Sequence, residues 1–372
     1  MAISTMMTKD LTKTAELRFK QIRSKMQSMK MDALLINHLP TIRYLTGFSG
    51  SYAHVVVLLD EIIFLTNDLY EQQINIELLP LRGMKTFISR NPFQEIASQK
   101  LLKKSKTLGI DGDHLMHNTV LGIQKLLPKV KCVPAGGIAQ EVTVVKSEQE
   151  IEHIRKAAQI ASKVFDSIVK IIKPGIKETD IATEIVYQGR KLGAEKESFD
   201  IIVVSGERSA MPHGRATDKK IKKGDMITLD FGFYVNGFAS DMTRSVMVGK
   251  ANPEQKKVYD TVLKAIETSN AAAKVGMNCK KLYAVARNII IAEGYGDYFR
   301  HSLGHGLGIE VHEMPRISAM NELEKLKKNT VITIEPGIYL PGKFGVRIED
   351  DIVITQKGAE ILTKATKQLL EL

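Results

Sequence analysis

Short apolar runs alternate with helical patterns along the first part of the chain. Residues 15–30 have the periodicity of an amphipathic helix, rich in lysine, arginine and methionine. The segments 33–36, 55–59 and 62–65 are continuous apolar runs of strand length. The alternation continues to about residue 133 and predicts one α/β domain of roughly 135 residues.

The pattern changes beyond residue 133. A cluster of breaker residues, Pro134-Ala135-Gly136-Gly137, marks a candidate boundary. Ser147 and Glu150 form a capping-box pair that predicts the start of a long helix over 148–172. The other expected elements are a helix at about 178–192, strands over 199–248, two helices within 254–295, and strands after 330.

The length of 372 residues fits two domains, and we assign residues 1–138 to the first and 139–372 to the second. Hydrophobic residues make up 44% of the chain and charged residues 26%, which argues against long disordered regions. The expected fold class is therefore a mixed α/β (α+β) protein.

Several functional classes can be set aside. No run of about 18 apolar residues occurs, and residues 1–14 lack a signal-peptide pattern, so we expect a cytoplasmic protein with no membrane partner. The two cysteines, Cys132 and Cys279, exclude a disulfide framework and a cysteine-rich zinc site. The net charge of +11 comes from scattered basic residues without a nucleic-acid-binding motif, so we expect no nucleic-acid partner.

Two acidic residues flank a predicted hairpin. Asn236-Gly237 lies between two strand-like runs and is a turn signal. A two-residue turn there places Asp230 opposite Thr243, with Asp241 as its diagonal neighbour. A shift of one residue places Asp230 directly opposite Asp241. In either register the two carboxylates can reach one centre; the alternative is a solvated polar face.

A second predicted hairpin repeats this arrangement. Glu335 ends one apolar run, Glu349 ends another, and both are equidistant from Gly342. Four clustered carboxylates would raise one another's pKa values, and a pair of divalent cations would relieve their repulsion. Arg347 shares a strand face with Glu349 and is expected to brace it. Asp351 shares that face too and is the rival for the role of ligand.

Three of the nine histidines, His301, His305 and His312, fall within twelve residues, interleaved with glycines. The glycines argue against an ordinary helix and permit close backbone approach to a site. His213 is a weaker candidate in a Pro-His-Gly turn. Oxygen ligands with one imidazole suit manganese, cobalt or iron, and zinc less distinctively. These patterns predict a two-metal hydrolase without naming a substrate.

The order and spacing of five residues resemble the metal ligands of the pita-bread metallopeptidases: Asp230, Asp241, His305, Glu335 and Glu349. Other matching motifs are Phe199-Asp200, Pro212-His213-Gly214, Ser240 to Arg244, the proline-peptidase signature from His301 to Glu313, Ile334 to Gly337, Arg347 to Asp350 and, in the first part, Asp32 to Leu35 and Ile42 to Gly50. The resemblance covers about residues 15 to 365. It implies a creatinase-type N-terminal α/β domain followed by a pita-bread domain with a pseudo-symmetric antiparallel sheet.

The resemblance also implies roles for the five ligands. Asp230 would chelate one of two divalent ions, and Asp241 and Glu349 would bridge both. His305 and Glu335 would complete the shell of the other ion, and Glu335 would also shuttle the proton of the attacking water. We expect manganese first, with cobalt, zinc or iron as alternatives.

Further roles implied by the resemblance concern the substrate. His213 and His312 match residues that contact the substrate during catalysis. His301, Tyr339 and Arg347 match residues that border the proline pocket or support the ligands. A homodimer is expected, because the first domain in this family covers the active site of a neighbouring subunit.

The branches of the family can be sorted in part. Methionine aminopeptidases normally lack the first domain, and creatinases do not keep the five ligands. A Xaa-Pro aminopeptidase or a Xaa-Pro dipeptidase (prolidase) remains, acting on proline-containing peptides; a non-catalytic binding protein is a more remote alternative. We expect the aminopeptidase, because no arginine could be assigned to hold the carboxylate of a C-terminal proline.

Overall fold

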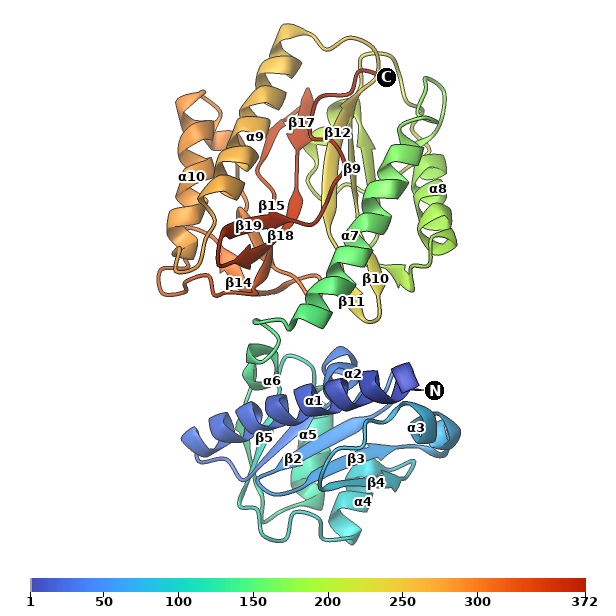
Figure 1. The fold of residues 1–372 in the computed structure, drawn as a ribbon, viewed down its shortest axis with the longest axis vertical. Helices are drawn as coiled ribbons and strands as arrows, with labels where there is room; N and C mark the ends of the chain where they lie inside the picture. Colours follow the sequence, from blue (N-terminus) through green and yellow to red (C-terminus); the bar gives the residue numbers. More distant parts are fainter. Residues whose placement is uncertain (1) are drawn as a thin grey trace. The chain divides into compact units, whose positions relative to one another are not determined.

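The protein is described here from a computed structural model, which covers the backbone of residues 2–372 and the side chains from residue 10 onward. The chain divides into two compact units (Figure 1), the first ending at Thr143 and the second running from Val144 to Leu372. Each unit has its own core and is described by itself.

The first unit is a six-stranded mixed sheet with helices on its faces. The strand order is β4-β3-β2-β1-β5-β6, with β1–β2 and β2–β3 antiparallel and the other pairs parallel. The strands are β1 (Ala33–Ile36), β2 (His54–Leu58), β3 (Ile62–Thr66), β4 (Met84–Ile88), β5 (Thr107–Ile110) and β6 (Lys131–Pro134). The helices are α1 (Ala2–Ser28), α2 (Leu39–Thr46), α3 (Glu71–Glu77), α4 (Pro92–Ser98), α5 (His117–Leu126) and α6 (Ile138–Glu141).

The continuous apolar runs of this unit form the central strands, as expected. Residues 33–36 and 62–66 are buried throughout because both faces of the sheet are covered. One face packs on α4 and α5 through Ile96 and Ile123. On α1, Phe19 and Ile22 are buried, which confirms the amphipathic helix predicted over 15–30.

The second unit contains two halves, each with strands backed by a pair of helices (Figure 1). In the first half, α7 (Glu148–Ile168) and α8 (Glu178–Lys191) share a core with a sheet of order β12-β9-β8. In the second half, α9 (Pro253–Ala272) and α10 (Cys279–Ala292) pack on a sheet of order β14-β13-β15-β18-β19 and on the hairpin β16–β17. This is the pseudo-symmetric pita-bread architecture that the family resemblance implied.

The strands of the second unit are short and mostly antiparallel. Those of the first half are β7 (Lys196–Glu197), β8 (Ile202–Ser205), β9 (Met226–Phe231), β10 (Phe233–Val235), β11 (Phe238–Ala239) and β12 (Met242–Met247). Those of the second half are β13 (Gly304–Gly306), β14 (Glu313–Ile317), β15 (Val331–Ile334), β16 (Gly337–Leu340), β17 (Phe344–Arg347), β18 (Asp350–Thr355) and β19 (Gly358–Ile361).

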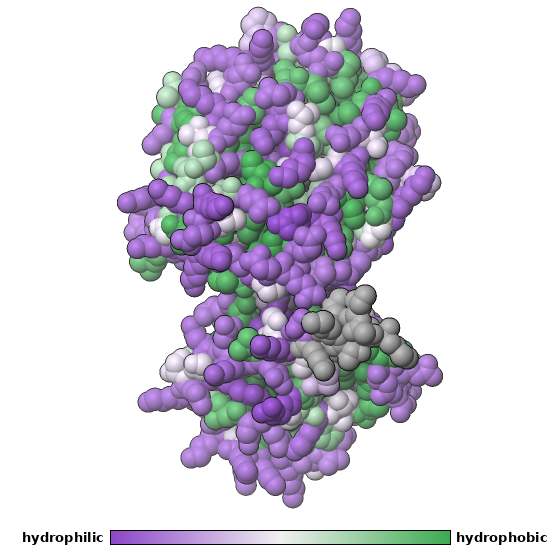
Figure 2. Space-filling view, in the orientation of Figure 1, coloured by the Kyte–Doolittle hydropathy of each residue, from purple (hydrophilic) through white to green (hydrophobic). Residues whose placement is uncertain are grey.

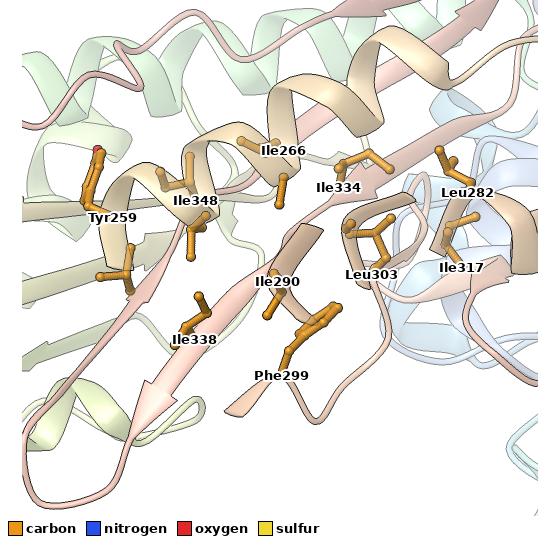
Figure 3. Packing of buried hydrophobic residues seen from close by; sticks show 14 of the residues in the cluster. Tyr259, Ile266, Leu282, Ile290, Phe299, Leu303, Ile317, Ile334, Ile338 and Ile348 are labelled. Carbon is orange, nitrogen blue, oxygen red and sulfur yellow. The ribbon is translucent and has the colours of Figure 1, made fainter. Parts of the chain in front are cut away.

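The predicted helices of this unit are confirmed with small shifts at their ends. Ser147 and Glu150 form the expected capping box, and α7 ends at Ile168, before the expected residue 172. In the second half, Ile266, Ile290 and Ile338 meet in an apolar core between helices and strands (Figure 3).

Hydrophilic side chains cover most of the face shown in Figure 2, with apolar side chains between them. Among residues 2–372, no helix combines the length and the apolar character needed to cross a bilayer.

The first predicted hairpin has the register of a two-residue turn. Asp230 pairs with Thr243, and Tyr234 pairs with Ala239, on either side of the turn. Asn236 and Gly237 have φ of 50° and 79°, the left-handed backbone that such a turn requires. The alternative register, with Asp230 opposite Asp241, is wrong.

The second hairpin is longer and is interrupted where its carboxylates lie. Thr333 pairs with Asp351 in one ladder, and Gly337 pairs with Arg347 in the next, with the same alignment. Glu335 and Glu349 occupy matching positions in the gap between the two ladders. Both carboxylates can therefore leave the sheet surface and turn toward a common centre.

Candidate active site

The structure brings the predicted ligands together inside the second unit. Donor atoms of Asp241, His305 and Glu349 all lie within 4.8 Å of one another. Nε2 of His305 lies 3.3 Å from Oε1 of Glu335 and 3.8 Å from Oδ2 of Asp241. Asp230 is linked to the group through Arg347, whose Nη2 lies 2.6 Å from its Oδ2. Side chains from β9, β13 and the ends of three further strands thus converge on one place.

The site is almost closed to solvent, so keeping four carboxylates ionised there costs free energy. Asp230, Asp241 and Glu349 are 7%, 5% and 2% exposed. Burial raises the pKa of each of these carboxyl groups, and the other carboxylates raise the pKa of Asp241 and Glu349 further. Buried carboxylates at this density must be compensated by cations or neutralised by protons.

Glu335 departs from the expected mutual rise in pKa. Burial opposes its ionisation, but the hydrogen bond and the charge of His305 outweigh that cost and lower its pKa to about 2. Burial also lowers the pKa of His305, and the hydrogen bond to Glu335 reverses this into a net rise. The expectation that all four carboxylates would be raised is therefore wrong for Glu335, because an imidazole lies against it.

The residues fit a divalent metal ion. Oδ1 of Asp230 is buried and has no hydrogen-bond partner among the described residues, although Oδ2 is paired with Arg347. A buried carboxylate oxygen without a donor leaves room for a partner that the described residues do not supply, and beside the convergent donors of Asp241, His305 and Glu349 a cation fits that place. Carboxylate oxygens with one imidazole are a donor set suited to manganese, cobalt or iron.

Arg347 braces a different carboxylate from the one expected. Its Nη2 donates to Asp230, its Nε donates to Oγ1 of Thr243 at 3.1 Å, and Thr243 donates to Oε2 of Glu349 at 2.6 Å. The direct contact expected with Glu349 is thus replaced by one through Thr243. The prediction assumed a regular strand, but the ladder ends at Arg347 and the backbone N–H of Glu349 bonds to β12 instead.

Two of the predicted histidines border this centre. Nε2 of His301 lies 3.1 Å from the hydroxyl of Tyr339, and that hydroxyl accepts from Nη1 of Arg347 at 2.7 Å. Burial lowers the pKa of His301 and raises that of Tyr339 to about 12. The ring of His312 lies 4.4 Å from the ring of His305, centroid to centroid, and burial lowers its pKa. His301 and Tyr339 are both largely apolar surfaces that end in a polar atom.

His213 lies on the segment that joins β8 to β9, which starts with the short helix η2 (Gly206–Ala210). It is exposed, and its charge is one of the causes that lower the pKa of His301 and of His312. The carbonyl of its neighbour Pro212 accepts from Nη1 of Arg347 at 3.2 Å. The structure therefore brings the weakest of the sequence candidates to the same site.

Asp351, the rival ligand, lies behind Asp241. Its Oδ2 accepts from the backbone N–H of Asp241 at 3.0 Å, and its Oδ1 is buried without a partner among the described residues. Burial raises its pKa well above the usual range. It is not in the group of three residues whose donor atoms converge.

Sequence reasoning missed the threonines that hold the ligands. Thr243 links Arg347 to Glu349, as described above. Oγ1 of Thr333 donates to Oε1 of Glu335 at 3.2 Å and accepts from the backbone N–H of His305 at 3.1 Å. The available signal was position: Thr243 was expected opposite Asp230, and Thr333 precedes Glu335 by the two-residue period of a strand face.

Arg316 was also missed. It lies on β14, four residues after His312, and the exposed positions of that segment are 312, 314 and 316. Its charge contributes to the lowered pKa of His312, so it lies near that imidazole. No hydrogen bond or ion pair of its guanidinium to another described residue is found. Only the face assigned by strand alternation could have singled it out.

The fold and the converging carboxylates and histidine define a metal-dependent hydrolase with a pita-bread domain. Comparison with known proteins identifies its family. Residues 152–356 match metallopeptidase family M24, and residues 18–155 match the creatinase/prolidase N-terminal domain. The chain therefore belongs to metallopeptidase family M24.

Relatives match over nearly their whole length. The Xaa-Pro dipeptidase of Pyrococcus furiosus is 38% identical over 95% of this chain and 99% of its own. A solved Xaa-Pro dipeptidase from Bacillus anthracis has a TM-score of 0.92 at 35% identity, covering 96% of this chain and 100% of its own. A solved X-Pro aminopeptidase from Thermotoga maritima has a TM-score of 0.85 at 36% identity, and the match covers 92% of this chain and 98% of its own.

Proposed function

We propose that this protein is a Xaa-Pro dipeptidase that hydrolyses the bond before a C-terminal proline. The sequence favoured an aminopeptidase because no arginine was available for the proline carboxylate. Arg316 supplies that cation, on the exposed face of β14 beside His312. Relatives named Xaa-Pro dipeptidases, from two Pyrococcus species among others, support this alternative over the aminopeptidase.

The five residues Asp230, Asp241, His305, Glu335 and Glu349 would hold two divalent metal ions. When bound, such ions supply a water of lowered pKa and positive charge for the oxygen that becomes negative in the transition state. Manganese is the first choice because oxygen donors dominate the set, with cobalt, iron and zinc as alternatives. Metal analysis of the purified protein tests this choice.

The chain's own residues would recognise the rest of the dipeptide. Glu335, ionised well below neutral pH, would accept a proton from the attacking water and pass it on. His213 and His312 would contact the scissile carbonyl and its developing charge. His301 and Tyr339 would border the pyrrolidine ring, and Arg316 would pair with the terminal carboxylate.

A single comparison of substrates tests the proposal. The protein with added manganese should cleave a Xaa-Pro dipeptide, and a matched Xaa-Pro-Xaa tripeptide should be cleaved at least ten-fold less efficiently in kcat/KM. Arg316→Met should raise KM for the dipeptide by about 10- to 100-fold and leave the tripeptide nearly unchanged, because only the dipeptide offers a carboxylate to that guanidinium. Equal or better cleavage of the tripeptide by the unaltered protein would restore the aminopeptidase.

Three further expectations stay proposals. We place the boundary between the creatinase-type and catalytic domains at residues 138 and 139. We expect a homodimer, which light scattering after size-exclusion chromatography would test. We expect the protein to act in the cytoplasm, which cell fractionation would test.

A further inference from the structure

A buried ion pair lies next to His312, on the side away from the metal ligands. Nζ of Lys146 lies 2.8 Å from Oε2 of Glu313, and the two side chains are only 1% and 6% exposed. Lys146 immediately precedes the N-cap of α7, whereas Glu313 begins β14. The pair therefore joins two segments far apart in the sequence. Neither residue belongs to the ligand set or to the proposed substrate contacts.

The exposure of two neighbouring side chains connects this pair to His312. His312 lies just before β14 and is exposed, whereas Glu313 begins β14 and its carboxylate is buried, so the two side chains lie on different faces of the chain. The ring of His312 packs on His305, whereas the carboxylate of Glu313 binds Lys146. Fixing the carboxylate on one face fixes the direction of the imidazole on the other.

The same carboxylate also organises the turn that precedes His312. Oε1 of Glu313 accepts from the backbone N–H of Glu310 at 3.1 Å, and the carbonyl of Glu310 accepts from the N–H of Gly308 at 3.0 Å. A Cβ on Gly308 would lie 2.7 Å from Oε1 of Glu313 and 2.7 Å from Cε of Lys146. Glycine at 308 therefore leaves room for the ion pair under the turn.

We propose that Lys146 and Glu313 are positioning residues, which hold the 307–313 turn so that His312 faces the scissile bond. A buried ion pair contributes little net stability compared with apolar residues of similar size, so the role that we assign to this pair is to constrain the geometry of the turn. The proposal rests on the proposed function, because it concerns the histidine assigned there to the substrate. A displacement of about 1 Å of such a group can cost 10²-fold in rate.

The test separates positioning from stability. Lys146→Met and Glu313→Gln should each lower kcat for a Xaa-Pro dipeptide by about 10- to 100-fold, with metal content unchanged. The double variant Lys146→Met with Glu313→Leu should regain the melting temperature, because apolar residues replace the pair. The kcat of the double variant should stay low, and the backbone amide hydrogens of residues 307–313 should exchange faster with solvent than in the unaltered protein.

Further variants keep the proposal falsifiable. Gly308→Ala disturbs the pair without removing a charge and should also lower kcat with metal content unchanged, even if the charge variants fold poorly. Arg155→Met is the matched control and should keep kcat. It removes a partly buried cation from α7 together with its ion pairs to Glu152 and Glu360.

Two outcomes would overturn the positioning role. One is recovery of both kcat and stability in the double variant, and the other is unchanged amide hydrogen exchange at residues 307–313. If the unaltered protein fails to cleave any Xaa-Pro peptide, the proposed function fails, while the exchange data still decide whether the pair orders the turn.

Discussion

Asp241 and Asp351 are two buried aspartates in contact, and their side chains have different roles. Asp241 points its carboxylate at His305 and Glu349, whereas Asp351 uses one oxygen to hold the backbone N–H of Asp241. Both are buried and both have a raised pKa, so neither burial nor pKa separates them. The direction in which each carboxylate points separates them.

This difference predicts distinct metal stoichiometry in two variants. Asp241→Ala should lose metal at both proposed positions, because its carboxylate is assigned to bridge them. Asp351→Ala should keep metal with a reduced affinity, since it only removes support from the backbone of Asp241. Equilibrium dialysis with manganese, followed by metal analysis, measures both. Metal loss in Asp351→Ala with retention in Asp241→Ala would reverse the two assignments.

At the scale of single residues, the sequence pointed to the candidate ligands but not to the side chains that support them. Asp230 and Glu335 could be predicted as candidates because each ends an apolar run, where a free carboxylate is unusual, and the full set of five could be predicted only through the family resemblance. The carboxylate that Arg347 contacts could not be predicted, because it depends on where the hydrogen-bond ladder between β16 and β17 ends. Arg316 and Thr333 were missed, because strand alternation is the only sequence signal that distinguishes them from other polar residues.

At the scale of elements, two hairpins set the geometry of the site. Asn236-Gly237 fixes the register that places Asp230 opposite Thr243. The sequence predicted a turn at Asn236-Gly237 but left two registers open, and the structure shows the one that a two-residue turn with two positive φ angles requires. The break in the second hairpin was not predicted, although Pro336 and Gly337 directly follow Glu335 and interrupt the strand pattern there.

The first hairpin can be tested through its turn. Gly237 has φ of 79°, so Gly237→Ala should lower the free energy of unfolding by about 1–2 kcal/mol through left-handed strain. It should also weaken manganese binding several-fold, because the turn sets the spacing of Asp230 and Asp241. Gly276→Ala is the control, with φ of 80°, open space at the Cβ position and a place in the loop between α9 and α10, outside the hairpin. It should lose similar stability with metal affinity unchanged; equal metal loss in both variants would show that strain alone weakens binding.

At the scale of the whole molecule, the candidate active site lies in one unit, and the other unit has a separate hydrophobic core. The proposed metal ligands all belong to the second unit, whereas the first unit has its own sheet and its own core. The two-unit organisation could be predicted from the alternating pattern and the change after residue 133. The way each unit responds to solvent conditions could not, because it depends on which titratable groups become buried.

His54 makes the first unit sensitive to acid. Its ring packs on Tyr52 and Phe93 at centroid distances of 5.3 and 5.0 Å, and its Nδ1 is buried without a partner among the described residues. Burial lowers its pKa from 6.5 to about 4. Between these values the unfolded chain binds a proton that the folded unit excludes, so stability is present above about pH 6.5 and is lost as the pH falls toward 4.

The loss attributable to this one group is about 2 kcal/mol at pH 5 relative to pH 7. His54→Phe keeps an aromatic ring in the same packing and removes the titration, so it should reduce the loss of stability on acidification by about that amount. The chain has no tryptophan, so amide hydrogen exchange in β2 is the better measure, and it reports on the first unit alone. An equal loss between pH 7 and pH 5 in the variant and the unaltered protein would assign the acid sensitivity to other groups, because only a group that titrates differently in the folded and unfolded chain can produce it.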